Sequence, residues 1–413
     1  MQSFPFSNGS PCVRQANFVK KPCLAITMIE ASALLPPAAM RYGRLRKTHT
    51  MNAHSPSLPD IDTRAAAAAP AKFRAPDDKD LLRAARDLTK DLGTANPRIY
   101  WTDMVASALL GYAALAAAIL AASVPATILF GLVAALALYR AMSFIHELTH
   151  LHRDALPGFR TGWNLLVGIP LLVPSFMYEG VHTLHHKRTQ YGTSEDPEYL
   201  PLALMKPWTL PAFVLVAMLA PVALLIRFAV LVPIGVLVPP VRRLLWERAS
   251  ALSINPDFRR KPPDEDLRVR AAWLEAGAML WALALLGSVF VFGWKPLLVA
   301  LAVASLAATL NQLRTLVAHL WENDGEAMSV TAQYLDSVNV PPPGLAAELW
   351  APVGLRYHAL HHLLPSMPYH ALPEAHRRLA KALDGGTTYH GANHPGMLHL
   401  VARIAKSTMR LRR

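Results

Sequence analysis

Residues 104–150 read MVASALLGYAALAAAILAASVPATILFGLVAALALYRAMSFIHELTH, and this stretch decides the fold class. Residues 104–139 carry no charged side chain. A helix crosses the hydrocarbon of a membrane in ~20 residues, so this run is too long for one span. It is interrupted at Ser123-Val124-Pro125. The stretch therefore predicts two membrane-spanning helices, at about 102–122 and 126–146.

A second uncharged pair lies further along the chain, at 276–294 and 296–313, separated by Lys295. Two more apolar stretches, 207–226 and 228–241, could either span the membrane or lie in its interface. Residues 163–176 are apolar but too short to cross. The pattern predicts an all-α integral membrane protein with four transmembrane helices and a cytosolic cap of further helices.

The composition supports a membrane protein. The chain is 53% hydrophobic and 17% charged, with a mean hydropathy of +0.25, which excludes a wholly disordered protein. Its formal charge of +13 comes from the two ends, because residues 1–100 carry net +7 and residues 371–413 net +6. A neutral apolar centre with basic flanks, lacking a basic patch interleaved with aromatics, argues against nucleic-acid binding.

Basic segments also predict the orientation and the domain limits. Lys and Arg concentrate in three segments, 72–98, 242–270 and 377–413. The positive-inside rule places these segments and both termini in the cytosol. We expect the membrane to be the plasma (inner) membrane. We expect a disordered tail at 1–75 with Met51 as a possible true start, a basic juxtamembrane segment at 76–100, a membrane domain at 101–382 and a basic tail at 383–413. Cys12 and Cys23 lie in the first of these parts, so the sequence offers neither a disulfide framework nor a cysteine metal site.

Nine of the 17 histidines form a pattern of three boxes and one single residue. Positions i and i+3 or i+4 share a helix face, so each box predicts imidazoles aimed at one point. Nine imidazoles exceed the ligands of one metal and suit two, and imidazole accommodates Zn, Cu, Fe and Ni. The predicted metal ligands are His146 and His150 in box one, His182, His185 and His186 in box two, His319 alone, and His358, His361 and His362 in box three.

The boxes constrain the topology. Box one follows the second predicted span and His319 follows the fourth, so both must lie on one side of the membrane to share a site. The segment 207–241 must then cross the membrane an even number of times, either zero or two. The segment 163–176, between boxes one and two, must return to the side on which it began.

The boxes in this order resemble those of the membrane fatty acid desaturase superfamily. Residues 357–370, YHALHHLLPSMPYH, are similar to the third box of bacterial acyl desaturases, and His182 to Pro197 to their second-box region. The resemblance covers about residues 100–382. It implies a non-haem diiron centre with two Fe ions, O2 as co-substrate, and electrons from a separate donor such as ferredoxin or a cytochrome b5-like protein. Relatives acting on acyl-CoA carry an Asn where this chain has Thr315, four residues before His319.

The predicted function is therefore an O2-dependent fatty acyl desaturase, acting on a long acyl chain carried by a lipid, CoA or a carrier protein. A hydroxylase or ketolase of the same superfamily would use the same centre. His146-Glu147-Leu-Thr-His150 also fits the HExxH motif of zinc metalloproteases, with Glu147 as general base. A non-enzymatic metal-binding or transport protein would need ionisable residues within its spans, and these spans have almost none.

Several residues near the boxes carry further expectations. Four carboxylates are candidates to orient the imidazoles from behind: Glu147, Glu179, Asp196 and Asp324. His152 lies two residues beyond box one, so we expect it off the ligand face. The basic residues Arg242, Arg243, Arg259, Arg260 and Lys261 fit a lipid-facing loop, or a docking site for an acidic electron carrier or an anionic headgroup.

Overall fold

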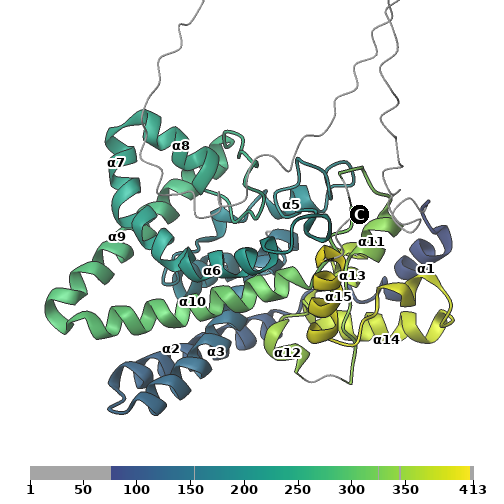
Figure 1. Ribbon diagram of the computed structural model, residues 1–413, viewed down its shortest axis with the longest axis horizontal. Helices are drawn as coiled ribbons and strands as arrows, with labels where there is room; N and C mark the ends of the chain where they lie inside the picture. Colours follow the sequence, from purple (N-terminus) through teal and green to yellow (C-terminus); the bar gives the residue numbers. More distant parts are fainter. Residues whose placement is uncertain (1–75, 153, 324, 344–345, 410–413) are drawn as a thin grey trace, which may run out of the picture.

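The structure is a computed structural model that describes residues 76–409, apart from residues 153, 324 and 344–345. Within these residues the chain folds into helices joined by loops, with isolated β-bridges but no strand (Figure 1). Five of the helices are long and apolar enough to cross a membrane. The predicted all-α integral membrane fold is confirmed. The expectations for residues 1–75, including Met51 and both cysteines, lie outside the described residues.

The first predicted hairpin consists of α2 (Pro97–Leu120) and α3 (Val124–His150). The side chains of Asn96 and Ser123 accept hydrogen bonds from the first turns of the two helices, and a proline follows each cap. The two helices touch closely, since a Cβ placed on Gly111 would lie 2.6 Å from the Leu138 side chain. Because α3 continues to His150, box one occupies its last turn.

The second predicted hairpin consists of α9 (Glu265–Phe292) and α10 (Trp294–Leu316). Gly293 makes the turn with a φ of 72°, a conformation that glycine adopts without strain. Lys295 Nζ donates a hydrogen bond of 2.9 Å to the Ala121 carbonyl at the α2–α3 turn. The turns of both hairpins therefore lie together at the end of the molecule away from the boxes, as Figure 1 shows.

The fifth long helix joins the two stretches whose role the sequence left open. It comprises α6 (Thr209–Ile226), the π-helical turn η7 (Arg227–Leu231) and α7 (Val232–Leu237). The sequence left this segment open between spanning and lying in the interface, and its length and composition make it a fifth candidate span beside the four predicted. The stretches join because Arg227 between them is buried, with its guanidinium 2.8 Å from the Glu275 carboxylate on α9, so its charge does not end the helix.

The segment containing this helix leaves and returns to one side of the protein. Before α6, the Ala203 N–H donates to the Trp321 carbonyl, and the Trp321 ring packs against His319. After α8 (Pro239–Ala249), the Asn255 amide donates to the Asp196 carbonyl at 2.9 Å. Both ends of the segment therefore lie beside the histidines, as the shared site requires.

The short apolar segment after box one also turns back. It forms α4 (Phe159–Trp163), the π-helical turn η4 (Asn164–Gly168) and the 3-10 turn η5 (Ser175–Met177). The Asn164 side chain closes the loop by accepting from the Ser175 N–H at 2.8 Å and donating to the Ser175 hydroxyl at 2.9 Å. Its return to the starting side, predicted from box positions, is confirmed.

Short helices on the histidine side form the cap. Leu81 on α1 packs into one buried apolar cluster with Leu360 on α13, Leu379 on α14 and Tyr389 on η9. The bounds of these elements are α1 (Lys79–Thr89), α5 (His182–His185), η6 (Leu202–Leu204), α11 (Val330–Asp336), α12 (Ala347–Trp350), α13 (His358–Leu363), η8 (Tyr369–Ala371), α14 (Leu372–Ala382), η9 (Thr388–Ala392) and α15 (Met397–Met409).

Candidate metal centre

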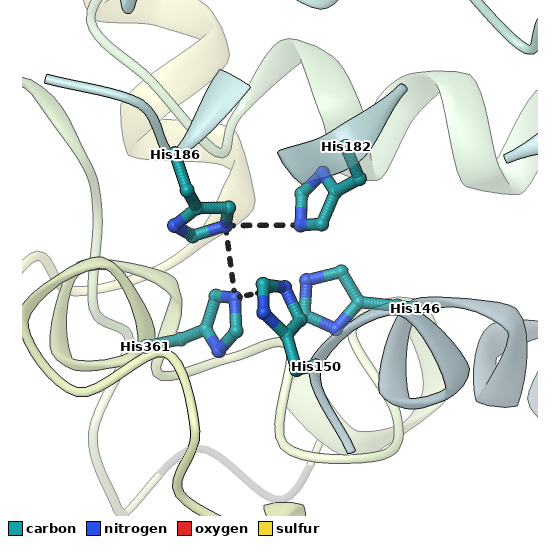
Figure 2. A group of neighbouring side chains, drawn as sticks. All are labelled: His146, His150, His182, His186 and His361. Carbon is teal, nitrogen blue, oxygen red and sulfur yellow. Dashed lines mark hydrogen bonds between the residues drawn. The ribbon is translucent and has the colours of Figure 1, made fainter. Parts of the chain in front are cut away.

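The nine predicted histidines come together in two adjacent groups. In each group, one ring nitrogen of every histidine lies within 4.8 Å of those of the others. Figure 2 shows the first group, in which the imidazoles of α3, α5 and α13 converge. The first group is His146, His150, His182, His186 and His361, and the second is His185, His319, His358 and His362.

The boxes divide between the groups, which corrects the expectation that each box points at one place. In box two, His182 and His186 join the first group and His185 joins the second. In box three, His358 and His362 join the second group and His361 joins the first. Successive residues of a helix are about 100° apart, so adjacent histidines cannot face one point. The HxxHH spacing therefore serves two neighbouring sites at once.

The imidazole nitrogens crowd together in a way that suits cations. His361 Nε2 lies 3.1 Å from the Nε2 atoms of both His150 and His186, and His358 Nε2 lies 3.0 Å from that of His319. Both ring nitrogens of His146 are buried without a hydrogen-bond partner. A neutral imidazole carries one donor and one lone pair, so these facing nitrogens present lone pairs to a shared space. The donor set fits two metal ions bound by nitrogen.

Side chains behind three of the imidazoles contact the Nδ1 atoms of these rings. Glu198 Oε1 lies 2.9 Å from His182 Nδ1, and an Asp196 oxygen lies 2.9 Å from His185 Nδ1. The Tyr191 hydroxyl lies 2.9 Å from His319 Nδ1 and donates to Asp336. Each contact engages Nδ1 and leaves Nε2 facing the group, as in known histidine metal sites.

The four carboxylates that the sequence predicted to orient imidazoles have different outcomes in the structure. Asp196 orients an imidazole, as predicted. Glu179 was a wrong candidate, because it pairs with Arg270 at 2.8 Å instead. Glu147 lies 3.7 Å from His146 Nδ1 and accepts hydrogen bonds from the Tyr100 hydroxyl and the Tyr369 N–H. Asp324 lies outside the described residues.

The sequence reasoning did not find Glu198 or Asp336. Glu198 follows Asp196 by two residues, directly after Pro197, and its N–H donates to an Asp196 oxygen at 2.8 Å. The closeness of two carboxylates to box two was the available signal for Glu198. Asp336 contacts the Tyr191 hydroxyl, which in turn contacts His319. No spacing in the sequence indicates a contact of this kind.

Burial keeps most of these imidazoles neutral, which is the form that binds metals. Burial is the main reason that six imidazoles have pKa values well below the usual range, and the neighbouring imidazoles lower these pKa values further. The six are His182, His186, His319, His358, His361 and His362. At His185 burial also lowers the pKa, but the carboxylates of Asp196, Glu198 and Asp336 outweigh it and raise the pKa. Burial raises the pKa of Glu198 to about 7.

Other histidines lie outside both groups. His152 is exposed and its Nδ1 lies 3.5 Å from Asp154, so it stays off the ligand face as predicted. His370 Nε2 accepts from the Asn96 N–H at 3.1 Å, and His376 Nδ1 meets the Tyr389 hydroxyl at 2.8 Å. The first contact joins the cap to the N-cap of α2, and the second joins α14 to η9 within the cap, so both histidines lie at interfaces between elements.

A cavity of about 340 Å³ reaches the first group. His146 and Glu198 line it together with side chains of α3, α6 and α10 and the loop 251–254, and its walls are mostly apolar. This volume lies at the lower end of the range found for small-molecule sites. The cavity places an apolar guest beside the histidines.

Comparison with known proteins agrees with this geometry. The sequence model of the family described as fatty acid desaturase matches residues 121–393. The chain belongs to the fatty acid desaturase family. It is also similar to a ceramide hydroxylase of Caulobacter vibrioides (strain NA1000 / CB15N), with 50% identity over 332 residues, which cover 79% of this chain and 93% of that protein. No solved structure matches the chain.

Membership of this family confirms the resemblance found in the boxes. The matched residues 121–393 contain all nine histidines of the two groups. The protein is therefore a membrane enzyme of the desaturase and hydroxylase superfamily, with histidine clusters that could hold metal. The zinc protease alternative needed His146, His150 and a third zinc ligand, with Glu147 as general base, whereas the structure surrounds the two histidines with three further imidazoles.

Proposed function

We propose that the protein is an O2-dependent hydroxylase of a ceramide or a closely similar lipid amide. One observation carries this proposal: a relative described as a ceramide hydroxylase is 50% identical over 93% of its own length. The predicted acyl desaturase has support only at the level of the family. The hydroxylase alternative is favoured because this high identity covers 79% of this chain.

We further propose that the nine histidines hold two iron ions, one in each group. The donor set fits, because all nine ligands are imidazoles and Nε2 atoms of neighbouring histidines lie 3.0–3.1 Å apart in both groups. Iron bound there would supply O2 activation and the removal of a hydrogen from an unactivated C–H bond. Asp196, Glu198 and Tyr191 hold the imidazoles in place, and the cavity keeps water away from the reacting chain.

The overall reaction needs an external source of electrons. One oxygen atom of O2 enters the C–H bond and the other leaves as water, with two electrons and two protons consumed. We propose a separate donor such as ferredoxin or a cytochrome b5-like protein. The basic segments that flank the spans favour histidine boxes on the cytosolic side of the inner membrane, where such a donor is found.

Product analysis tests the reaction type. Purified protein with its metal intact would be given ceramide, O2 and a reduced ferredoxin, and the lipids analysed by mass spectrometry. We expect a ceramide that has gained one oxygen atom without a new double bond. A product that has lost two hydrogens would restore the desaturase interpretation. Turnover that persists without O2 would exclude both.

Metal analysis tests the centre. We expect about two irons per chain and almost no zinc, because nine imidazoles without cysteine exceed the ligands that one zinc ion uses. The measurement is elemental analysis of protein purified in mild detergent. One zinc per chain and no iron would instead support the HExxH metalloprotease.

A further inference from the structure

The walls of the cavity change character along its length. On α10 the lining residues are Val303, Ala304 and Ala308 deep in the membrane, followed by Asn311, Arg314 and Thr315 toward the histidine end. On α3 they are Leu138 and Met142, followed by Ser143 and His146. Both helices run toward the histidine groups at their carboxyl ends. The polar part of the cavity is therefore the part beside the proposed metal centre.

The third wall, formed by α6, is apolar along its whole length. Gln312 donates to the Phe213 carbonyl at 3.0 Å, and Ser305 donates to the Met218 carbonyl at 2.8 Å, so α6 runs antiparallel to α10. The later lining residues of α6, including Ala220 and Pro221, therefore face the deep end and are apolar. The cavity is therefore polar beside the histidines on the α3 and α10 walls, and apolar away from them on all three walls.

Arg314 is the charged residue of α10 that lines this cavity. No carboxylate of the described residues forms an ion pair with it. Its Nε is buried without a hydrogen-bond partner, while its guanidinium lies beside the Tyr139 hydroxyl. A buried donor left without an acceptor costs about 1–3 kcal/mol. A guest that supplies an oxygen acceptor to Arg314 would remove this cost.

This arrangement bears on which carbon of a lipid can react. The reacting C–H bond must lie at the histidine end, where His146 lines the same wall as Arg314 and Thr315. A methylene from the middle of a chain would bring further hydrocarbon against Arg314 and Asn311 and leave their donors unsatisfied. An amide carbonyl or a hydroxyl close to the reacting carbon would satisfy them.

We propose that Arg314 and Asn311 bind the amide head of the lipid substrate. Hydroxylation then falls on a carbon only a few bonds from the amide, while the hydrocarbon occupies the apolar part of the cavity. This inference rests on the proposed hydroxylation of a lipid amide and adds the position of the reaction. Arg314 and Asn311 are thereby specificity-determining residues, distinct from the histidines.

The position of the new hydroxyl tests the inference in the wild-type enzyme. Ceramide with saturated chains would be converted by iron-loaded protein, and the product fragmented by tandem mass spectrometry. We expect the hydroxyl next to the amide or its neighbouring hydroxyl groups. A hydroxyl in the middle or at the end of a chain would overturn the inference and leave the proposed function standing. Absence of any hydroxylated ceramide with iron bound would overturn the proposed function.

Two variants test the residues. Arg314→Met and Asn311→Leu each remove head-binding donors at similar volume, and we expect the KM for ceramide to rise about tenfold or more at unchanged iron content. Arg268→Met is the matched control, because Arg268 is exposed at the start of α9 and outside the cavity. A wild-type KM and an unchanged product in both variants would overturn the inference.

The inference can still be tested if one of these variants loses its iron. Arg314→Lys keeps the charge but loses the forked donors, and Asn311→Leu removes no charge at all. If Arg314→Met loses iron, we expect these two variants to keep iron and to raise the KM or scatter the hydroxyl along the chain. Wild-type kinetics and product from both, at normal iron content, would contradict a head-binding role.

Discussion

Adjacent histidines have different tasks in this protein. His185 and His186 belong to different groups, and so do His361 and His362. Box spacing predicted eight of the nine candidate ligands, because imidazoles repeated at i, i+3 and i+4 are rare without a shared purpose, and His319 was added as a single histidine after the fourth predicted span. It could not predict the division between two groups, since that depends on how α5 and α13 face each other. Asp336 was also beyond prediction, because Tyr191 lies between it and His319.

Removing the carboxylate behind His185 should weaken metal binding without unfolding the protein. Asp196→Asn keeps the size of the side chain but removes the charge that accepts from His185 Nδ1 at 2.9 Å. We expect iron affinity to fall about 10–100-fold, as for other residues that orient histidine ligands. Iron retained against a graded chelator measures this. Glu179→Gln is the control, and equal loss of iron from both variants would contradict the assignment.

Replacement of a ligand histidine should affect turnover much more than replacement of His152, the histidine next to box one. We expect His185→Ala and His361→Ala to abolish hydroxylated product while the protein still inserts, because insertion depends on the apolar helices. His152→Ala should largely spare turnover, since His152 is exposed and pairs with Asp154. Lipid analysis beside a membrane-fraction blot measures both effects. An inactive His152→Ala protein with normal iron would require a new assignment of the box-one ligands.

At the level of elements, apolar runs predicted the two long hairpins but not where their helices end. α3 continues through box one and α9 begins at Glu265, where Asp264 caps it. The helix Thr209–Leu237 was missed as one unit, because Arg227 interrupts its apolar run and the partner Glu275 lies 48 residues further along the chain. The short helices α5 and α13 are held by tertiary contacts and have too few residues for a periodic signal.

The packing of α14 on η9 should make the cap sensitive to acid. Burial lowers the pKa of His376 to about 4, with help from the charges of His390 and Arg356. Below the unfolded pKa of about 6.5, the unfolded chain binds a proton that the folded chain does not, so stability falls as the pH drops from 6.5 toward 4. The loss is at most about 3 kcal/mol from this group.

A comparison of two proteins isolates this contribution. His376→Asn can still accept from the Tyr389 hydroxyl but does not titrate in this range, so its stability should fall less between pH 6.5 and 4. Thermal unfolding in detergent at several pH values gives the difference, and titration of the metal ligands affects both proteins alike. Parallel pH curves for the two proteins would show that His376 does not titrate as described.

At the scale of the whole molecule, one shared site constrains the path of the chain. The requirement that box one and His319 meet predicted that residues 163–176 and 207–241 return to their starting side, and the structure confirms both returns. The cavity could not be predicted in the same way. It exists only where α3, α6 and α10 come together, and its polar end depends on which faces of these helices turn inward.

The same whole-molecule view predicts where the chain can be shortened. The nine histidines and the cavity lie between residues 138 and 362, and the first described helix is α1. Deletion of residues 1–50 should therefore spare turnover and membrane insertion. Deletion of residues 1–92 should not, because α1 buries Leu81 and Ala85 against the cluster that contains Leu360 of α13, between the ligands His358 and His361.

The longer deletion should act through the metal centre. Losing a buried leucine contact in a core commonly costs about 2–5 kcal/mol. The N-cap residue of α1, Asp78, also donates its N–H to the Thr331 hydroxyl at 2.8 Å. We expect the protein without residues 1–92 to insert but to bind less iron and to unfold at a lower temperature than the protein without residues 1–50. Iron content and thermal unfolding of the two truncated proteins, measured side by side, decide this. Equal iron and equal unfolding temperatures would show that α1 does not support box three.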